Sequence, residues 1–117
     1  MASLRQLEAS FLRVTASLDP LEKVQLTFRQ VEEMRGAHGV WFLCPKCFAE
    51  NGGPEGTHAV ICWFRGLVPD DLDPKPGRWN PSGTGLDDLT FVPPGAVSVQ
   101  LLSGCGWHGF VKNGQAE

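Results

Sequence analysis

The chain has 117 residues, of which 42% are hydrophobic and 20% charged, and its formal net charge is −3. This composition is typical of one globular domain and excludes the disordered and fibrous classes. Its 10 Lys and Arg residues are scattered, which argues against a protein that mainly neutralises nucleic-acid phosphates. No apolar run reaches the roughly 20 residues of a membrane span, and no signal-peptide pattern begins the chain, so we expect a cytoplasmic protein.

The first residues predict a short helix. It runs from Ser3 to Glu8, with Ser3 as the N-cap and with Leu4 and Leu7 on one face. Residues 11–16 fit either a continuation of this helix or a strand, because their apolar residues suit both periods.

A second N-terminal helix is predicted after a short strand at Val24–Leu26. Thr27 and Gln30 have the spacing of a capping box, and Gly36 is the natural residue to end such a helix. The apolar face of this helix would consist of Phe28, Val31 and Met34.

After Gly39 the residue pattern predicts β-strands, because short apolar runs alternate with turn residues. A long loop is predicted from Val68 to Gly85, a stretch rich in Pro, Gly and Asp. An Asn113-Gly114 turn is predicted near the end of the chain. The predicted strands are Val40–Leu43, Thr57–Phe64, "DLTFV", Ala96–Leu102 and "GFVKNG".

These elements predict a single α+β domain over residues 1–117. It would combine a small, mostly antiparallel β-sheet with zinc-ribbon-like knuckles and one or two N-terminal helices. Residues 1–36 would form the N-terminal helical and strand segment. Residues 37–117 would form the zinc-knuckle β region, with the long loop at 66–86.

Two short motifs have the spacing of metal ligands. "CPKC" follows a predicted strand and has two residues between Cys44 and Cys47. "CGWH" follows another predicted strand and has the same spacing between Cys105 and His108. In such a knuckle both side chains can point at one ion while backbone amides donate to the sulfur. Three thiolates and one imidazole form a closed tetrahedral set that suits Zn²⁺. The sequence therefore predicts a zinc site at Cys44, Cys47, Cys105 and His108.

Other roles for these residue types remain open. Cys44 and Cys47 could be free thiols or a redox pair, although no βαβ pattern and no predicted helix start accompany them. His58 is the alternative fourth ligand, should His108 point away. His58 and Cys62 lie about 13 Å apart along an extended strand, so they cannot share an ion without a bend. We expect Cys62 to be a buried core residue.

The chain has four tryptophans. We expect Trp41 and Trp63, on predicted strands, to pack in the core, and Trp107 to shield the thiolates from water. Trp79 either pins the long loop to the sheet or forms a recognition surface with Arg78.

Enzyme motifs are missing from the sequence. It contains no P-loop, no dinucleotide fingerprint, no H-E-x-x-H and no G-x-S-x-G, and the zinc-deaminase pattern fails. Neighbouring loop aspartates such as Asp70 and Asp71 are typical turn residues. The sequence therefore favours a protein that is not an enzyme.

Three stretches together resemble a family of small proteins encoded by tailed bacteriophages and prophages. They are "VWFLCPKCFAENGGPEGTHAVICWF", "PGRWNPSGTGLDDLTF" and "GCGWHGFVKNG", and the resemblance covers residues 36 to 114. It implies a phage origin, a place in the infected bacterial cytoplasm or in the virion, and a zinc-ribbon-like site at the four predicted ligands. It implies no activity.

The favoured hypothesis is a phage-encoded zinc-binding adaptor that presents a surface to a phage or host protein. One alternative is a small zinc enzyme whose metal keeps a position open to water. The other is a zinc ribbon that binds nucleic acid, which the acidic chain disfavours.

Overall fold

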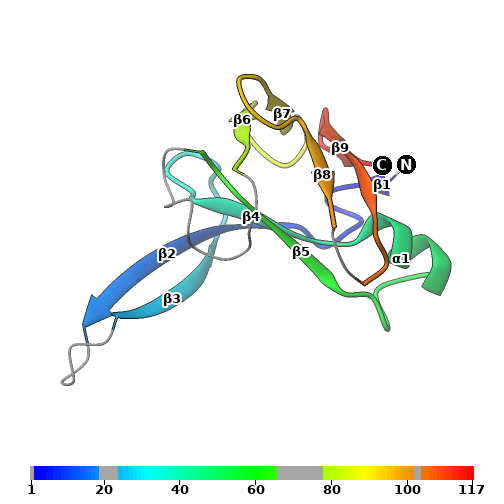
Figure 1. The fold of residues 1–117 in the computed structure, drawn as a ribbon, viewed down its shortest axis with the longest axis horizontal. Coiled ribbons are helices and arrows are strands. Elements are labelled where there is room, and N and C mark those ends of the chain that lie inside the picture. Colours follow the sequence, from blue (N-terminus) through cyan, green and yellow to red (C-terminus); the bar gives the residue numbers. More distant parts are fainter. Residues whose placement is uncertain (1, 19–23, 66–77, 102–103) are drawn as a thin grey trace.

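The protein is described by a computed structural model that covers residues 2–18, 24–65, 78–101 and 104–117. It is built mostly from antiparallel strands, with one short helix in the described part of the chain (Figure 1). Across these residues, no helix is long and apolar enough to cross a membrane.

The larger sheet has the strand order β3-β2-β4-β5. Its strands are β2 (Ser10–Leu18), β3 (Val24–Val31), β4 (Gly39–Leu43) and β5 (Ala59–Trp63). Strand β4 pairs with β2 only at residues 10–12, so the rest of β2 pairs with β3 alone. The β2–β3 hairpin therefore projects from the body as a two-stranded arm (Figure 1).

A second sheet joins the two ends of the described chain, with the order β1-β10-β9-β8. Its strands are β1 (Ala2–Ser3), β8 (Ser98–Gln100), β9 (His108–Lys112) and β10 (Gln115–Ala116), and a separate ribbon pairs β6 (Asn80–Ser82) with β7 (Thr90–Val92). The predicted Asn113-Gly114 turn is confirmed between β9 and β10. Both residues have positive φ, which Asn and Gly tolerate best.

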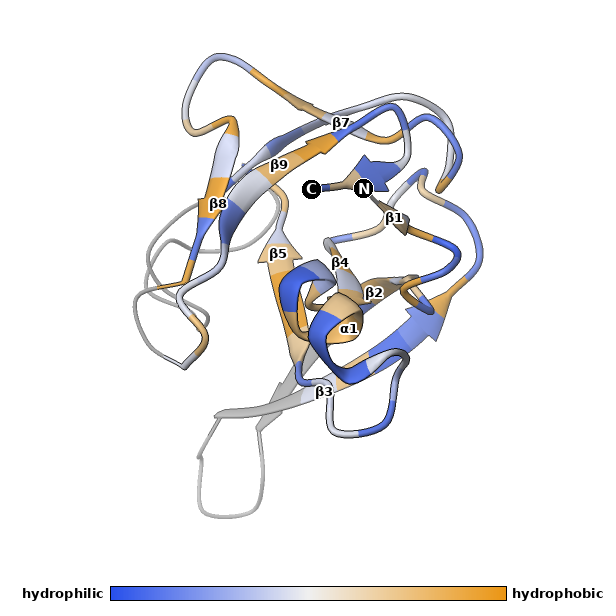
Figure 2. Cartoon of the chain, turned by 90° about the vertical axis from the view of Figure 1, so that its right-hand side faces the viewer, coloured by the Kyte–Doolittle hydropathy of each residue, from blue (hydrophilic) through white to orange (hydrophobic). Residues whose placement is uncertain are grey.

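The core lies between the inner faces of the two four-stranded sheets, which are larger than the β6–β7 ribbon. Val40 and Phe42 of β4 and Val60 and Cys62 of β5 are buried in this core, and Figure 2 shows hydrophobic residues along β5. Leu12 and Trp63 form a second, smaller buried cluster. Burial of this apolar surface is the main source of stability. The largest side chains with almost no exposure are Trp63, Phe11, Phe42, Phe64, Leu4, Leu7 and Leu89.

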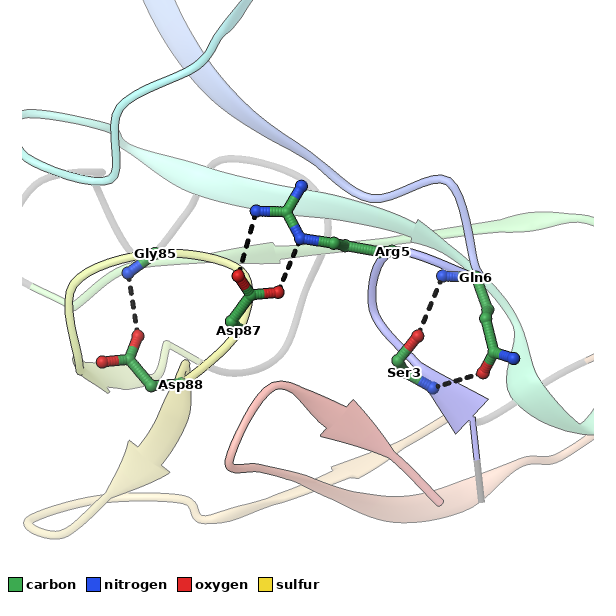
Figure 3. A network of polar contacts seen from close by, with 6 residues as sticks. All are labelled: Ser3, Arg5, Gln6, Gly85, Asp87 and Asp88. Carbon is green, nitrogen blue, oxygen red and sulfur yellow. Dashed lines mark hydrogen bonds and ion pairs between the residues drawn. The ribbon is translucent and has the colours of Figure 1, made fainter.

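The first predicted helix is reduced to a turn. Ser3 and Gln6 cap each other as an N-cap pair, with Ser3 N–H donating to Gln6 Oε1 at 2.9 Å and Gln6 N–H donating to Ser3 Oγ at 3.1 Å (Figure 3). Glu8 then adopts a φ of 56°, which ends the helical path. Leu4 and Leu7 still share one buried face, as the pattern indicated.

The second predicted helix is wrong. Thr27 to Val31 complete strand β3, in register with Thr15 to Phe11 of β2. The capping-box spacing was outweighed by eight consecutive hairpin pairs with β2. Gly36 has the expected positive φ of 79°, but it closes a turn and ends no helix.

The helix α1 (Pro45–Asn51) was not predicted. It begins directly after Cys44, has Pro at its first position, and ends at Gly52 with a φ of 72°. Pro at the first position and Gly just past the end are ordinary helix boundaries, so the sequence did contain this signal.

The strands predicted after Gly39 are confirmed, with shorter bounds in β5, β7 and β8, and β9 begins one residue earlier than predicted, at His108. Of the loop predicted from Val68 to Gly85, the residues up to position 77 lie outside the described part of the chain. Its last part includes β6 and a tight turn in which Asp88 accepts hydrogen bonds from the backbone of Thr84 and Gly85, the latter drawn in Figure 3.

Trp79 joins the two larger sheets. Its indole is buried, donates to the carbonyl of Ser98 at 2.9 Å, and stacks on Phe91. Its backbone bridges Phe64 on one side and Ala96 on the other. The pinning interpretation agrees with this placement, and Arg78 beside it is also buried.

Candidate metal centre

Four side chains from three separate parts of the chain converge at one end of α1. They belong to Cys44, Cys47, His58 and Cys105, and their ligand atoms all lie within 4.8 Å of one another. The sulfurs of Cys44 and Cys105 are 3.5 Å apart, and His58 Nε2 lies 3.3 Å from Cys105 Sγ. The cysteines form no disulfide.

The first knuckle is the junction between β4 and α1. Cys44 is the N-cap of the helix, and its carbonyl accepts the first helical hydrogen bond, from Phe48 N–H at 2.9 Å. Cys47 lies in the first turn of α1, so the helical path returns its side chain to the same side as Cys44. Cys44 is buried and Cys47 is half-buried.

His58 is brought to the site by the pairing of β4 with β5. The register places Leu43 opposite Ala59, and one step further Cys44 N–H donates to the carbonyl of His58 at 2.9 Å. Nδ1 of His58 lies 3.4 Å from the carbonyl oxygen of Ala59. A proton on Nδ1 would donate to this carbonyl and leave Nε2 free as a ligand, the usual arrangement for metal-binding histidines.

Cys105 reaches the site from the turn before β9. Its neighbours Gly104 and Gly106 have φ values of 67° and 71°, which glycine adopts without strain. Lys46 Nζ donates to the carbonyl of Cys105 at 2.8 Å and ties this turn to α1. The first knuckle and the turn that carries Cys105 are therefore held together by a protein contact as well as by their shared site.

The thiols differ in their acidity. Burial is the largest influence on Cys44 and raises its pKa, although the backbone amides of Cys47 and Lys46 act against it. Burial and the neighbouring thiols raise the pKa of Cys47 to about 12. At Cys105, burial is outweighed by the hydrogen bonds from His58 and from the Trp107 amide, so its pKa falls to about 7.

The distances suit one tetrahedral ion. With Zn–S bonds of about 2.3 Å and a Zn–N bond of about 2.05 Å, tetrahedral geometry separates two sulfurs by about 3.8 Å and a sulfur from a nitrogen by about 3.6 Å. The observed 3.5 Å and 3.3 Å approaches are close to these values. Amides directed at Cys44 and Cys105 would also stabilise bound thiolates.

The structure brings together three of the four predicted ligands, and His58, the alternative fourth ligand, takes the place expected for His108. Strand β9 begins at His108, which pairs with Gln100, so the chain is already extended where a knuckle would need a turn. Strand alternation then exposes the imidazole of His108, which stacks against Phe110. Trp107 points into the core and meets the ring of Phe42 edge-on.

Cys62 is buried in the core, as expected, and burial raises its pKa. The argument against a redox role of Cys44 and Cys47 relied in part on the lack of a helix after Cys44, and this part is wrong, because α1 begins at Pro45. However, both thiols have raised pKa values, whereas a redox nucleophile needs a lowered one. Because a third cysteine and a histidine complete the group, metal binding fits better than a dithiol pair.

Comparisons of the chain with protein-family models, with curated proteins and with solved structures find no match. The function must therefore be argued from the site itself.

Proposed function

We propose that this protein is a zinc-binding adaptor whose metal is structural, held by Cys44, Cys47, His58 and Cys105. The observation that carries the proposal is the convergence of four ligand atoms within 4.8 Å. Soft sulfur ligands with one imidazole favour zinc over calcium or magnesium, and four protein ligands leave no position for a reactive water.

The position of the site supports a structural role. An ion there would join the β4–α1 junction, the start of β5 and the turn before β9, which belong to two different sheets. A domain of this size buries a limited share of its surface, and a metal is a common way to add stability.

The adaptor role is supported by the surface beside the site. An open hollow of about 520 Å³ lies between α1, β9 and β10, and aromatic and apolar side chains alternate there with Lys46 and His108. Hollows of this size that combine an apolar floor with a few polar groups are typical of small-molecule sites, and the same features suit a side chain that a protein partner inserts. We propose that a phage or host protein docks there, in the infected bacterial cytoplasm or in the virion.

Metal analysis tests the structural part of the proposal. We expect one zinc per purified chain, and a Co²⁺-substituted protein with the absorption of a tetrahedral site rich in thiolates. Cys105→Ser should weaken the sulfur-to-cobalt band and lower the melting temperature. A metal-free wild type that is fully folded would refute the zinc, and a zinc with a bound water would favour the enzyme alternative.

A pull-down from infected cells tests the adaptor part. Zinc-loaded wild type should retain a specific protein, and Phe48→Glu, which alters the hollow and no ligand, should lose it while keeping its zinc. Retention of the same protein by both forms would contradict docking at the hollow. Recovery of nucleic acid in place of protein would support the nucleic-acid alternative.

A further inference from the structure

The β2–β3 arm ends the larger sheet with an open edge. Among the strands that the structure describes, β3 pairs with β2 and with no other. The strand is eight residues long, and all eight pair with β2 without a bulge. Thr27, Phe28, Arg29 and Gln30 are all exposed.

Within the described residues, this edge has few of the features by which monomeric proteins protect themselves. Edge strands are usually kept short, bulged, covered, or marked with Pro or charged side chains, because their unpaired backbone groups bind other strands. The sequence of β3, "VQLTFRQV", contains no Pro, no Lys and no acidic residue, and Arg29 is its one charge. Phe28 is 51% exposed, among the few large hydrophobic side chains on the surface of the described residues.

Backbone hydrogen bonds show which peptide groups face outward. In β2, Val14 N–H donates to His38 Nδ1 and the Leu12 carbonyl accepts from His38 N–H, so even-numbered residues of β2 point toward β4. The odd-numbered residues therefore point toward β3. Their partners in β3 include Thr27 and Arg29, whose peptide groups face inward. The outward groups belong to Val24, Leu26, Phe28 and Gln30.

We propose that β3 pairs with β3 of a second copy of this chain, antiparallel, about a two-fold axis at Thr27. In this register Val24 lies opposite Gln30 of the other copy, and Leu26 lies opposite Phe28. All four outward peptide groups of each copy are then paired, whereas an axis at Phe28 would use only three. The dimer would contain one continuous sheet through both arms.

Charge and side-chain pairing agree with this register. Arg29 falls opposite Gln25 of the other copy, so no like charges face each other across the junction. The axis brings Thr27 opposite Thr27, and Thr pairs on neighbouring strands are favourable. Because the edge of β3 can pair with the same edge of a second copy, the interface needs no other protein.

The position on the axis gives a direct test. We expect the zinc-loaded wild type to have twice its 12.8 kDa chain mass in sedimentation equilibrium at high concentration, and to dissociate on dilution. Thr27→Glu and Thr27→Lys should each be monomers at concentrations where the wild type is a dimer, because each places like charges opposite each other. An equimolar mixture of the two variants should form heterodimers. Ala49→Glu, an exposed change on α1, should leave the dimer intact.

A second pair of variants separates association from folding. Gln30→Pro removes an outward N–H, so it should abolish the dimer while the metal content and near-UV circular dichroism of the wild type are kept. Arg29→Pro removes an inward N–H and should damage the β2–β3 hairpin itself. A wild type that is monomeric at all concentrations would overturn the proposal. So would a dimer that persists in both Thr27 variants, or a mixture of the two that stays monomeric.

Discussion

His58 and Cys105 are 47 positions apart in the chain, and Nε2 of the histidine lies 3.3 Å from the sulfur of the cysteine. His58 stands at the start of β5 and Cys105 in the turn before β9, so this approach joins the two larger sheets. An ion bound between them would hold the two sheets together at this point, as the proposed structural role requires.

The first prediction distinguishes the two candidate histidine ligands. His58→Ala should weaken zinc binding by at least about 100-fold, because loss of a direct ligand costs more than loss of a supporting hydrogen bond. His108→Ala should leave the affinity unchanged, since its exposed imidazole stacks on Phe110. Competition with a chromophoric chelator measures both affinities. The reverse result would return the fourth position to His108.

The identity of the fourth ligand also marks the limit of what the sequence could predict. The spacing of Cys44 and Cys47 indicates a shared site, because residues that close in the chain must be close in space. No local pattern pairs His58 with Cys105, since this depends on the register of β4 with β5 and on the packing of two sheets. His108 matched the knuckle spacing, but pairing with Gln100 extends the backbone there.

The fold was predictable to a similar degree. Strands with strong β-branched and aromatic content, such as Val40–Leu43, were found from local pattern alone. Thr27 to Val31 carries both a helical capping pattern and strand formers, and a hairpin with distant residues decides between them. The sequence pattern does not predict α1, because the spacing of Cys44 and Cys47 is also typical of a turn. Pro45 and Gly52 nevertheless mark the two ends of the helix.

The second prediction concerns the hydrogen bond between Lys46 Nζ and the carbonyl of Cys105. Lys46→Met keeps the length of the side chain and removes the donor, so it should reduce the free energy of unfolding by about 0.5–1 kcal/mol, a modest value because Lys46 is exposed. It should also speed zinc release to a chelator. Lys112→Met, at an exposed site on β9, is the matched control and should change neither quantity.

The third prediction concerns the pair Arg5 and Asp87, which ties the N-terminal turn to the loop before β7 (Figure 3). The hydrogen bond from Arg5 lowers the pKa of Asp87. A carboxylate with a lowered folded-state pKa contributes stability above its unfolded pKa of about 3.9 and loses it as the pH falls through the folded value. The pair should therefore stabilise the protein at neutral pH and stop doing so in acid.

A double-mutant cycle of Arg5→Gln and Asp87→Asn isolates this pair from acid-induced loss of metal. The coupling free energy should be favourable and small at pH 7, because both side chains are exposed. It should decline in acid and in high salt. A coupling that stays constant from neutral pH to well below the unfolded pKa would contradict the role of Asp87 ionisation.

The fourth prediction tests how closely β4 and β5 pack at the end of their pairing that lies away from the candidate metal centre. A Cβ added at Gly39 would lie 2.5 Å from a ring carbon of Trp63 and 2.8 Å from the carbonyl oxygen of Cys62, which is backbone and cannot rotate away. Gly39→Ala should therefore reduce the free energy of unfolding by about 1–3 kcal/mol, the usual cost of overpacking. Gly39 lies four positions before Leu43 along β4, about 13 Å from the strand end that positions His58, so zinc affinity should change little. Gly85→Ala is the control: its Cβ would meet no atom within 4 Å, so stability should stay within about 0.5 kcal/mol in chemical denaturation. Equal stability of the two variants would show that the β4–β5 junction can relax around the added methyl group, which would contradict the close fit at Gly39.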